Sequence, residues 1–83
     1  MALQKEHIFK GFSSPEAYFE VVEVCPIKRI GRVFIRIEIF RDATKETLLE
    51  SIVREEEYSP EANVTWAYTQ LKQLPEFAGA VDV

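Results

Sequence analysis

The arrangement of hydrophobic and polar residues predicts that the first 58 residues are rich in strands and that a helix follows them. The clearest strand spans Arg32–Arg41, where aliphatic residues alternate with charged or aromatic ones. Successive side chains of a strand point to opposite faces, so this alternation marks one face for the core. The aliphatic face carries Val33, Ile35, Ile37 and Ile39, and the other face carries Arg32, Phe34, Arg36, Glu38 and Phe40.

Two earlier segments also predict strands. Tyr18–Cys25 is dense in β-branched and aromatic residues, and Leu3–Lys10 is a candidate for a short first strand. Turn-forming residues follow at Gly11–Pro15 and again at Pro26–Gly31. We therefore expect Tyr18–Cys25 and Arg32–Arg41 to form an antiparallel hairpin.

The segment Thr47–Tyr58 fits two structures. Its apolar residues Leu48, Leu49, Ile52 and Val53 have helical spacing, whereas an extended chain would leave neither face wholly apolar. A two-stranded hairpin alone is only marginally stable, however, so a further strand here would complete the sheet. The pattern by itself leaves both structures open.

The helix predicted for residues 60–74 has signals at both ends. Ser59 suits the N-cap, and Pro60 suits the first helical position, where its missing N–H needs no partner. Pro75 disfavours helical structure at the residue before it. Apolar residues spaced three and four apart form one stripe, which consists of Val64, Ala67, Tyr68, Leu71 and Leu74.

Two features of this region have a structural and a functional interpretation. Trp66 lies off the apolar stripe, so it either packs beside the sheet or anchors a partner. The tail, residues 75–83, carries Phe77 and Val81, and leaving a ring such as Phe77 exposed forgoes about 1.5–3 kcal/mol of burial. We expect Phe77 to dock on its own sheet or on a neighbouring subunit. Because Pro75 directs the tail away from the helix, the pattern favours the neighbour.

The composition indicates a single globular domain over residues 1–83. The chain is 47% hydrophobic and 29% charged, and its net charge of −4 argues against nucleic acid as the main partner. Cys25 is the only cysteine, so no internal disulfide is possible, and its apolar surroundings predict a buried thiol. We expect neither a signal peptide nor a membrane-spanning segment, because no apolar run has the length that either needs.

Few residues offer catalytic or metal-binding chemistry. His7 is the only histidine and is expected to be solvated, and the three glycines lie too far apart for a phosphate-binding loop. Glu55–Glu57 is an acidic run, but consecutive strand residues point to alternate faces and cannot converge on one ion. The sequence therefore predicts no catalytic, cofactor-binding or metal-binding residues, and it argues against an enzyme.

A candidate protein interface lies on the outward face of the Arg32–Arg41 strand. Arginines and aromatic rings interleave there at Arg32, Phe34, Arg36 and Phe40. This mixture is typical of interface cores, and it also occurs in sites for single-stranded nucleic acid. The structural alternative is that the helix or tail covers the face. Together with Trp66, Phe77 and Val81, these four residues are the candidate interface, and we expect the protein to form homo-oligomers because its core is small.

The end of the chain resembles that of small proteins of unknown function from tailed bacteriophages and prophages, which finish in a motif of the type Y..LK.LPEFAGA.DV. The residues that match are Tyr68, Leu71, Lys72, Leu74, Pro75, Glu76, Phe77, Ala78, Gly79, Ala80, Asp82 and Val83. The fold that this resemblance implies is a β-meander followed by one helix. The resemblance therefore favours a strand at Thr47–Tyr58, and no active site comes with it.

With this resemblance, the expected fold is α+β: an antiparallel meander of three to four strands with one C-terminal helix packed on the sheet. The resemblance implies a non-enzymatic structural or assembly protein, associated with the virion tail region or with other phage proteins. It also implies a location in the host bacterial cytoplasm or in the virion. The alternative is a small phage regulator that binds a host protein.

Overall fold

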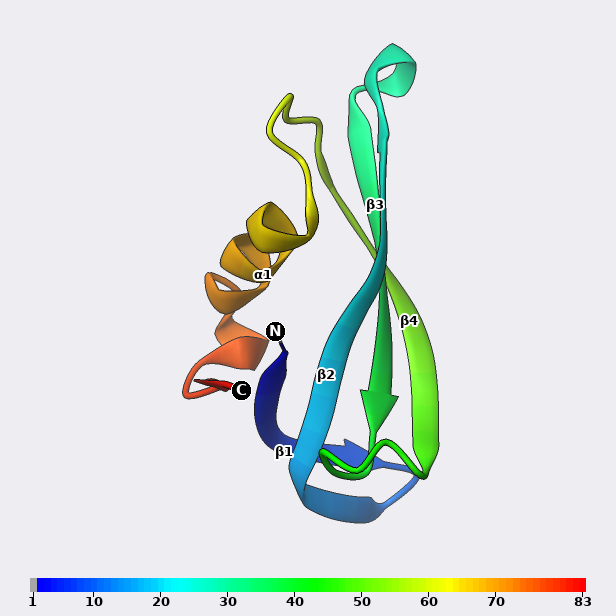
Figure 1. Ribbon diagram of the computed structural model, residues 1–83, viewed down its shortest axis with the longest axis vertical. Coiled ribbons are helices and arrows are strands. Elements are labelled where there is room, and N and C mark those ends of the chain that lie inside the picture. The colour runs from blue at the N-terminus through cyan, green and yellow to red at the C-terminus, as the bar shows by residue number, and fades with distance from the viewer. Residues whose placement is uncertain (1) are drawn as a thin grey trace.

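A computed structural model describes residues 2–83 and confirms the α+β class. These residues form a five-stranded antiparallel sheet and one α-helix, α1 (Figure 1). The strands are β1 (Leu3–Phe9), β2 (Phe12–Ile27), β3 (Arg32–Phe40), β4 (Leu48–Glu57) and β5 (Val81–Asp82), and α1 spans Val64–Lys72. The order across the sheet is β4-β3-β2-β1-β5, so the first four strands form the expected meander. The fifth strand, which was not predicted, comes from the tail.

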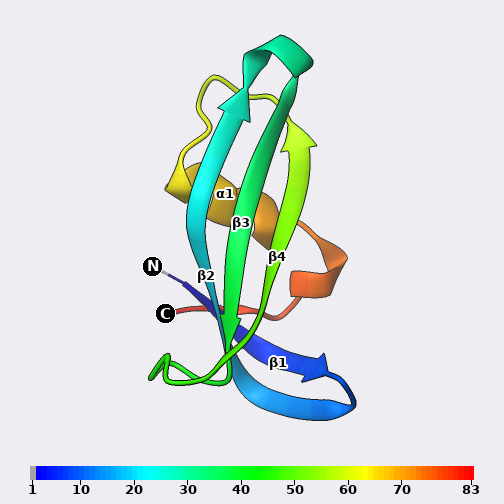
Figure 2. The same cartoon turned by 90° about the vertical axis from the view of Figure 1, so that its right-hand side faces the viewer.

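The helix covers one face of the sheet, and within residues 2–83 no second layer covers the opposite face of β2, β3 and β4 (Figure 2). The face under the helix is the predicted aliphatic one, and its β3 side chains are at most 1% exposed. Three residues of the predicted helical stripe complete this core. The buried residues of β3 and α1 are Val33, Ile35, Ile37, Ile39, Ala67, Tyr68 and Leu71.

The segment after β3 is a strand, as the resemblance favoured. β4 pairs antiparallel with β3 and lies at the edge of the sheet. Two of its polar residues on the helix side, Glu50 and Arg54, have partners from distant parts of the chain. Glu50 Oε2 lies 2.8 Å from His7 Nε2, and Arg54 Nη1 lies 2.5 Å from Glu76 Oε1. These long-range contacts explain why the helix side of the segment is not wholly apolar in the sequence.

His7 was expected to be solvated, but its side chain is half-buried. In addition to its contact with Glu50, its ring meets the ring of Phe19 edge to face, with the centroids 5.5 Å apart. His7 therefore ties β1 to β4, which are not neighbours in the sheet.

The long strand β2 contains a β-bulge that changes which of its residues face the helix. The register against β3 shifts between Val21 and Glu23, with Val21 opposite Ile37 and Glu23 opposite Arg36. One additional residue at a bulge exchanges the two faces beyond it. Cys25 consequently points away from the helix and is exposed, so the expectation of a buried thiol was wrong.

The helix is shorter than predicted. It begins at Val64 and not at residue 60, because Asn63 and not Ser59 is its N-cap. The Asn63 side chain accepts a hydrogen bond from the Trp66 N–H at 2.8 Å. Ser59 instead begins a separate turn, in which its hydroxyl accepts from the Glu61 N–H at 3.2 Å. The helix ends at Lys72, two residues before the predicted end.

We expect Asn63→Ala to lower the free energy of unfolding by about 1 kcal/mol, the usual cost of losing an N-cap side chain. Ser59→Ala is the matched control, because it removes a hydroxyl that accepts one hydrogen bond outside the helix. Urea denaturation of the two variants measures the difference. Equal losses, or a larger loss for Ser59→Ala, would contradict the assignment of Asn63 as the cap.

The tail docks on its own chain. After a 3₁₀ turn at Pro75–Phe77, the ring of Phe77 is only 4% exposed and packs in the core. Strand β5 then pairs antiparallel with β1, and Ala2 and Val83 exchange two backbone hydrogen bonds of 3.0 Å. The expectation that the tail docks is confirmed, but its partner is this chain and not the neighbouring subunit that the pattern favoured.

Candidate functional site

The side of the sheet opposite α1 is the principal candidate site, and we call it the open face. The pairing registers identify the side chains that share it on the three strands. On β2 these are Tyr18, Glu20, Glu23, Cys25 and Ile27; on β3 they are Arg32, Phe34, Arg36, Glu38 and Phe40; on β4 they are Leu48, Ser51, Val53, Glu55 and Glu57.

Apolar and aromatic groups lie across the open face. Tyr18 and Phe40 are cross-strand neighbours with ring centroids 6.4 Å apart, and Phe34 lies opposite Cys25. Two aliphatic side chains on β4 are mostly in solvent, with Leu48 51% and Val53 60% exposed. A sheet normally buries an apolar face against another layer, so this face is suited to a partner.

The charges of the open face are mainly negative. Two arginines stand among five glutamates, and Arg32 Nε lies 3.2 Å from Glu55 Oε1. A face with this balance repels phosphate groups, which argues against the nucleic-acid interpretation.

A lysine in the neighbouring loop between β3 and β4 offsets one unfavourable charge pair on the open face. Glu20 and Glu38 lie directly opposite each other, an arrangement that destabilises a sheet. Lys45 Nζ lies 2.9 Å from Glu20 Oε2 and 5.9 Å from the centre of the Tyr18 ring. The hydrogen bond from Lys45 to Glu20 raises the pKa of Lys45 above its ordinary value. Lys45 therefore stays charged and partly neutralises this corner of the face.

The structure brings four of the seven predicted interface residues together on this face: Arg32, Phe34, Arg36 and Phe40. The other three lie elsewhere. Trp66 is half-buried on α1 and packs against the core, as the structural interpretation expected, and Phe77 is in the core. Val81 is 60% exposed on the edge strand β5.

The sequence interpretation missed Cys25, Leu48 and Val53 as members of the open face. Val53 follows from alternation once Thr47–Tyr58 is taken as a strand, so its signal was present in the sequence. Leu48 shares this face only because the pairing of β3 with β4 shifts register between Ile39 and Phe40. Cys25 depends on the bulge in β2, which no local pattern revealed.

Other kinds of site find little support in the part of the chain that is described. Within residues 2–83, no three His, Cys, Asp or Glu side chains are placed to hold a metal ion. In the same range, no helix is long and apolar enough to cross a membrane.

No protein-family model, curated protein or solved structure matches this chain. The resemblance of its ending to phage proteins therefore stays a prediction.

Proposed function

We propose that this protein is a non-enzymatic structural or assembly protein that acts by protein–protein association through the open face of its sheet. The observation that carries the proposal is the absence of a second layer over the apolar and aromatic side chains of β2, β3 and β4 within residues 2–83. Aromatic residues and arginine are enriched in interface cores, and the open face offers both. The resemblance of the chain ending supports a role in phage assembly or in the virion tail region.

A second copy of this chain is the proposed occupant of the open face. Symmetric dimers bury the same patch on both subunits, which requires a self-complementary surface. The face carries both signs of charge, so Arg36 of one copy can meet glutamates of the other. Two sheets that pack face to face also bury their apolar side chains, here Phe34 and Val53, between them. This burial has to outweigh the repulsion between two faces that are each mainly negative.

Val53→Glu tests this association. Val53 is mostly exposed, so the fold should tolerate the change. An interface would then have to bury a sixth carboxylate on this face, and that carboxylate would lie opposite Arg36 and compete for it. We expect a dimer for the original chain in sedimentation velocity, and a dissociation constant raised about tenfold or more for Val53→Glu. Val64→Glu is the matched control, because Val64 is 46% exposed on α1, in the other layer. It should leave the dissociation constant unchanged.

The Cys25 thiol gives an independent measurement on the same face. It is exposed in the single chain, so a dimer through the open face should slow its alkylation as protein concentration rises. A protein that stays monomeric at several hundred micromolar, with a constant alkylation rate, would contradict self-association. That result would favour the alternative, a regulator that uses this face on a host protein.

A further inference from the structure

A concave surface, separate from the open face, lies at the end of the sheet where the β1–β2 hairpin meets the loop between β3 and β4. It is a pocket of about 340 Å³ with apolar walls formed by Phe9, Phe12 and Leu49. Small-ligand pockets begin at about 300 Å³, so the space suits one side chain and its neighbouring groups. None of its lining residues belongs to the open face, so we call it the hairpin pocket and treat it separately.

Exposed apolar side chains gather at this end of the molecule. Phe12 is 78% exposed although it lines the pocket. Two further apolar side chains at this end, Ile8 and Leu48, are 64% and 51% exposed but do not line the pocket. An exposed aromatic ring at the wall of a pocket is available to a ligand.

Two cations, Lys10 and Arg41, and two serines, Ser13 and Ser14, complete the lining of the hairpin pocket, which contains no carboxylate. Lys10 occupies the left-handed region with φ of 50°, followed by Gly11 with φ of 82°, as the tight hairpin turn requires. A lysine is unusual in this conformation, where asparagine and glycine are preferred. Its Nζ lies 5.3 Å from the centre of the Phe9 ring, so the charge sits beside the apolar wall.

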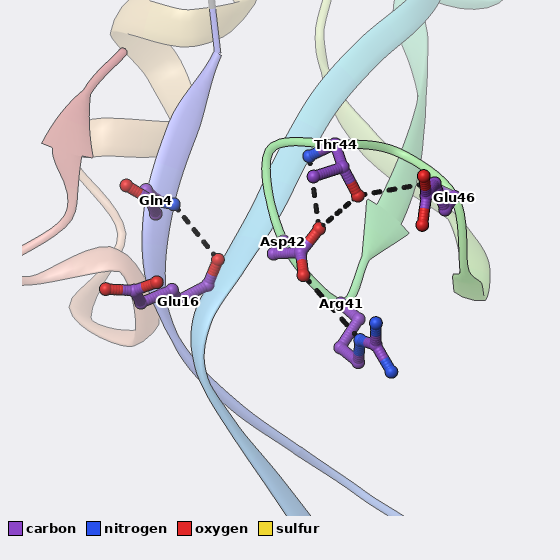
Figure 3. A network of polar contacts seen from close by, with 6 residues as sticks. All are labelled: Gln4, Glu16, Arg41, Asp42, Thr44 and Glu46. Carbon is purple, nitrogen blue, oxygen red and sulfur yellow. Dashed lines mark hydrogen bonds and ion pairs between the residues drawn. The ribbon is translucent and has the colours of Figure 1, made fainter.

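Arg41 belongs to the loop between β3 and β4, where it contacts Asp42 (Figure 3). The Arg41 N–H donates to the Thr47 carbonyl at 2.9 Å, and Arg41 Nε lies 3.7 Å from Asp42 Oδ2. Asp42 is fixed in turn, because its Oδ1 accepts hydrogen bonds from the Thr44 N–H at 3.1 Å and from the Thr44 hydroxyl at 2.5 Å. These hydrogen bonds with Thr44 hold the pKa of Asp42 below its ordinary value.

We propose that the hairpin pocket binds the C-terminus of a partner peptide that ends in an apolar residue. The apolar side chain would lie between Phe9, Phe12 and Leu49, and the terminal carboxylate would pair with Lys10 and Arg41. Charge complementarity selects this occupant, since a lining with two cations and no carboxylate stands out in a chain of net charge −4. Guanidinium and carboxylate groups also match in geometry.

A pair of small probes tests the proposal. N-acetyl-L-phenylalanine mimics an apolar C-terminal residue with its carboxylate, and N-acetyl-L-phenylalanine amide has the same side chain without the charge. In ¹H–¹⁵N NMR titrations, we expect the acid to shift the resonances of Phe9–Ser14, Arg41 and Leu49. The acid should bind about twofold to fivefold more tightly than the amide, the range expected for exposed ion pairs.

Three variants separate the two parts of the site. Arg41→Gln should remove most of the preference for the acid, while the control Arg29→Gln, in the exposed turn between β2 and β3, should retain it. Phe12→Ser should weaken the binding of both probes by a similar factor. Because Phe12 is mostly exposed, the variant should fold normally, and the same spectra check this. The proposal is overturned if no resonance of the pocket shifts at 50 mM probe. Equal affinities for acid and amide, or an unchanged preference in Arg41→Gln, would overturn it equally.

Discussion

Phe77→Ala should lower the free energy of unfolding by about 3–5 kcal/mol, the usual cost of truncating a buried aromatic side chain. The ring of Phe77 is 4% exposed and meets the ring of Phe19 edge to face at 5.3 Å. Lys5 Nζ lies 5.1 Å from the centre of the Phe77 ring and also donates to the Glu76 carbonyl. Small domains have a total stability of about 5–15 kcal/mol, so this one side chain in the tail decides much of it.

Val81→Ala is the control within the same tail. Val81 is 60% exposed, so we expect a change of about 0.5 kcal/mol or less. Urea denaturation of both variants measures the two losses. If Phe77→Ala kept its stability and lost only its association, Phe77 would be an interface residue and its assignment to the core would be wrong.

Tyr68→Phe should cost about 1–3 kcal/mol, because it leaves a buried backbone donor without its acceptor. The Tyr68 hydroxyl accepts a hydrogen bond from the Val21 N–H at 2.9 Å, at the beginning of the bulge in β2. This contact joins α1 to the strand at the point where the sheet ladder is interrupted. Phenylalanine keeps the ring and its packing, so the variant isolates the hydroxyl.

Tyr68 also predicts a dependence on alkaline pH. Burial raises its pKa above the ordinary 10.0, and the hydrogen bond from Val21 lowers it to a smaller extent. The folded state therefore favours the neutral phenol, and this contribution to stability is complete below pH 10 and declines as the pH rises through the folded pKa. The stability difference between the original chain and Tyr68→Phe should narrow above pH 10. A constant difference in urea denaturation between pH 9 and pH 11 would contradict this.

Regular, local features of the fold could be predicted from the sequence. The alternation in β3 identified its buried and open faces, because every second residue is aliphatic over the whole strand. The spacing of Ala67, Tyr68 and Leu71 likewise identified the buried side of α1. Each pattern recurs several times along its element, so one residue that departs from it would not change which face is predicted to be buried.

Features that depend on distant contacts could not be predicted in the same way. Ser59 and Asn63 are both good N-cap residues, and only the hydrogen bond to Trp66 distinguishes them. β4 looked ambiguous because the partners of Glu50 and Arg54 lie in β1 and in the tail.

The same distinction holds for the candidate sites. Phe34 and Phe40 were identified because they share the regular alternation of β3. The exposure of Cys25 was missed because the bulge is set by pairing with β3. The hairpin pocket was also missed, because Phe12 and Arg41 come from different hairpins that meet only in the folded sheet.

The pairing of Ala2 with Val83 bears on the order in which the molecule is assembled. These two residues lie at almost opposite ends of the chain, yet they exchange backbone hydrogen bonds beside β1. The meander of β1–β4 consists of residues 3–57 alone, so it can form before β5 pairs, and until then β1 keeps an unpaired edge. Contacts between distant residues also carry the largest loop-closure entropy. The folding chain therefore passes through a stage in which an incomplete sheet is exposed to other chains.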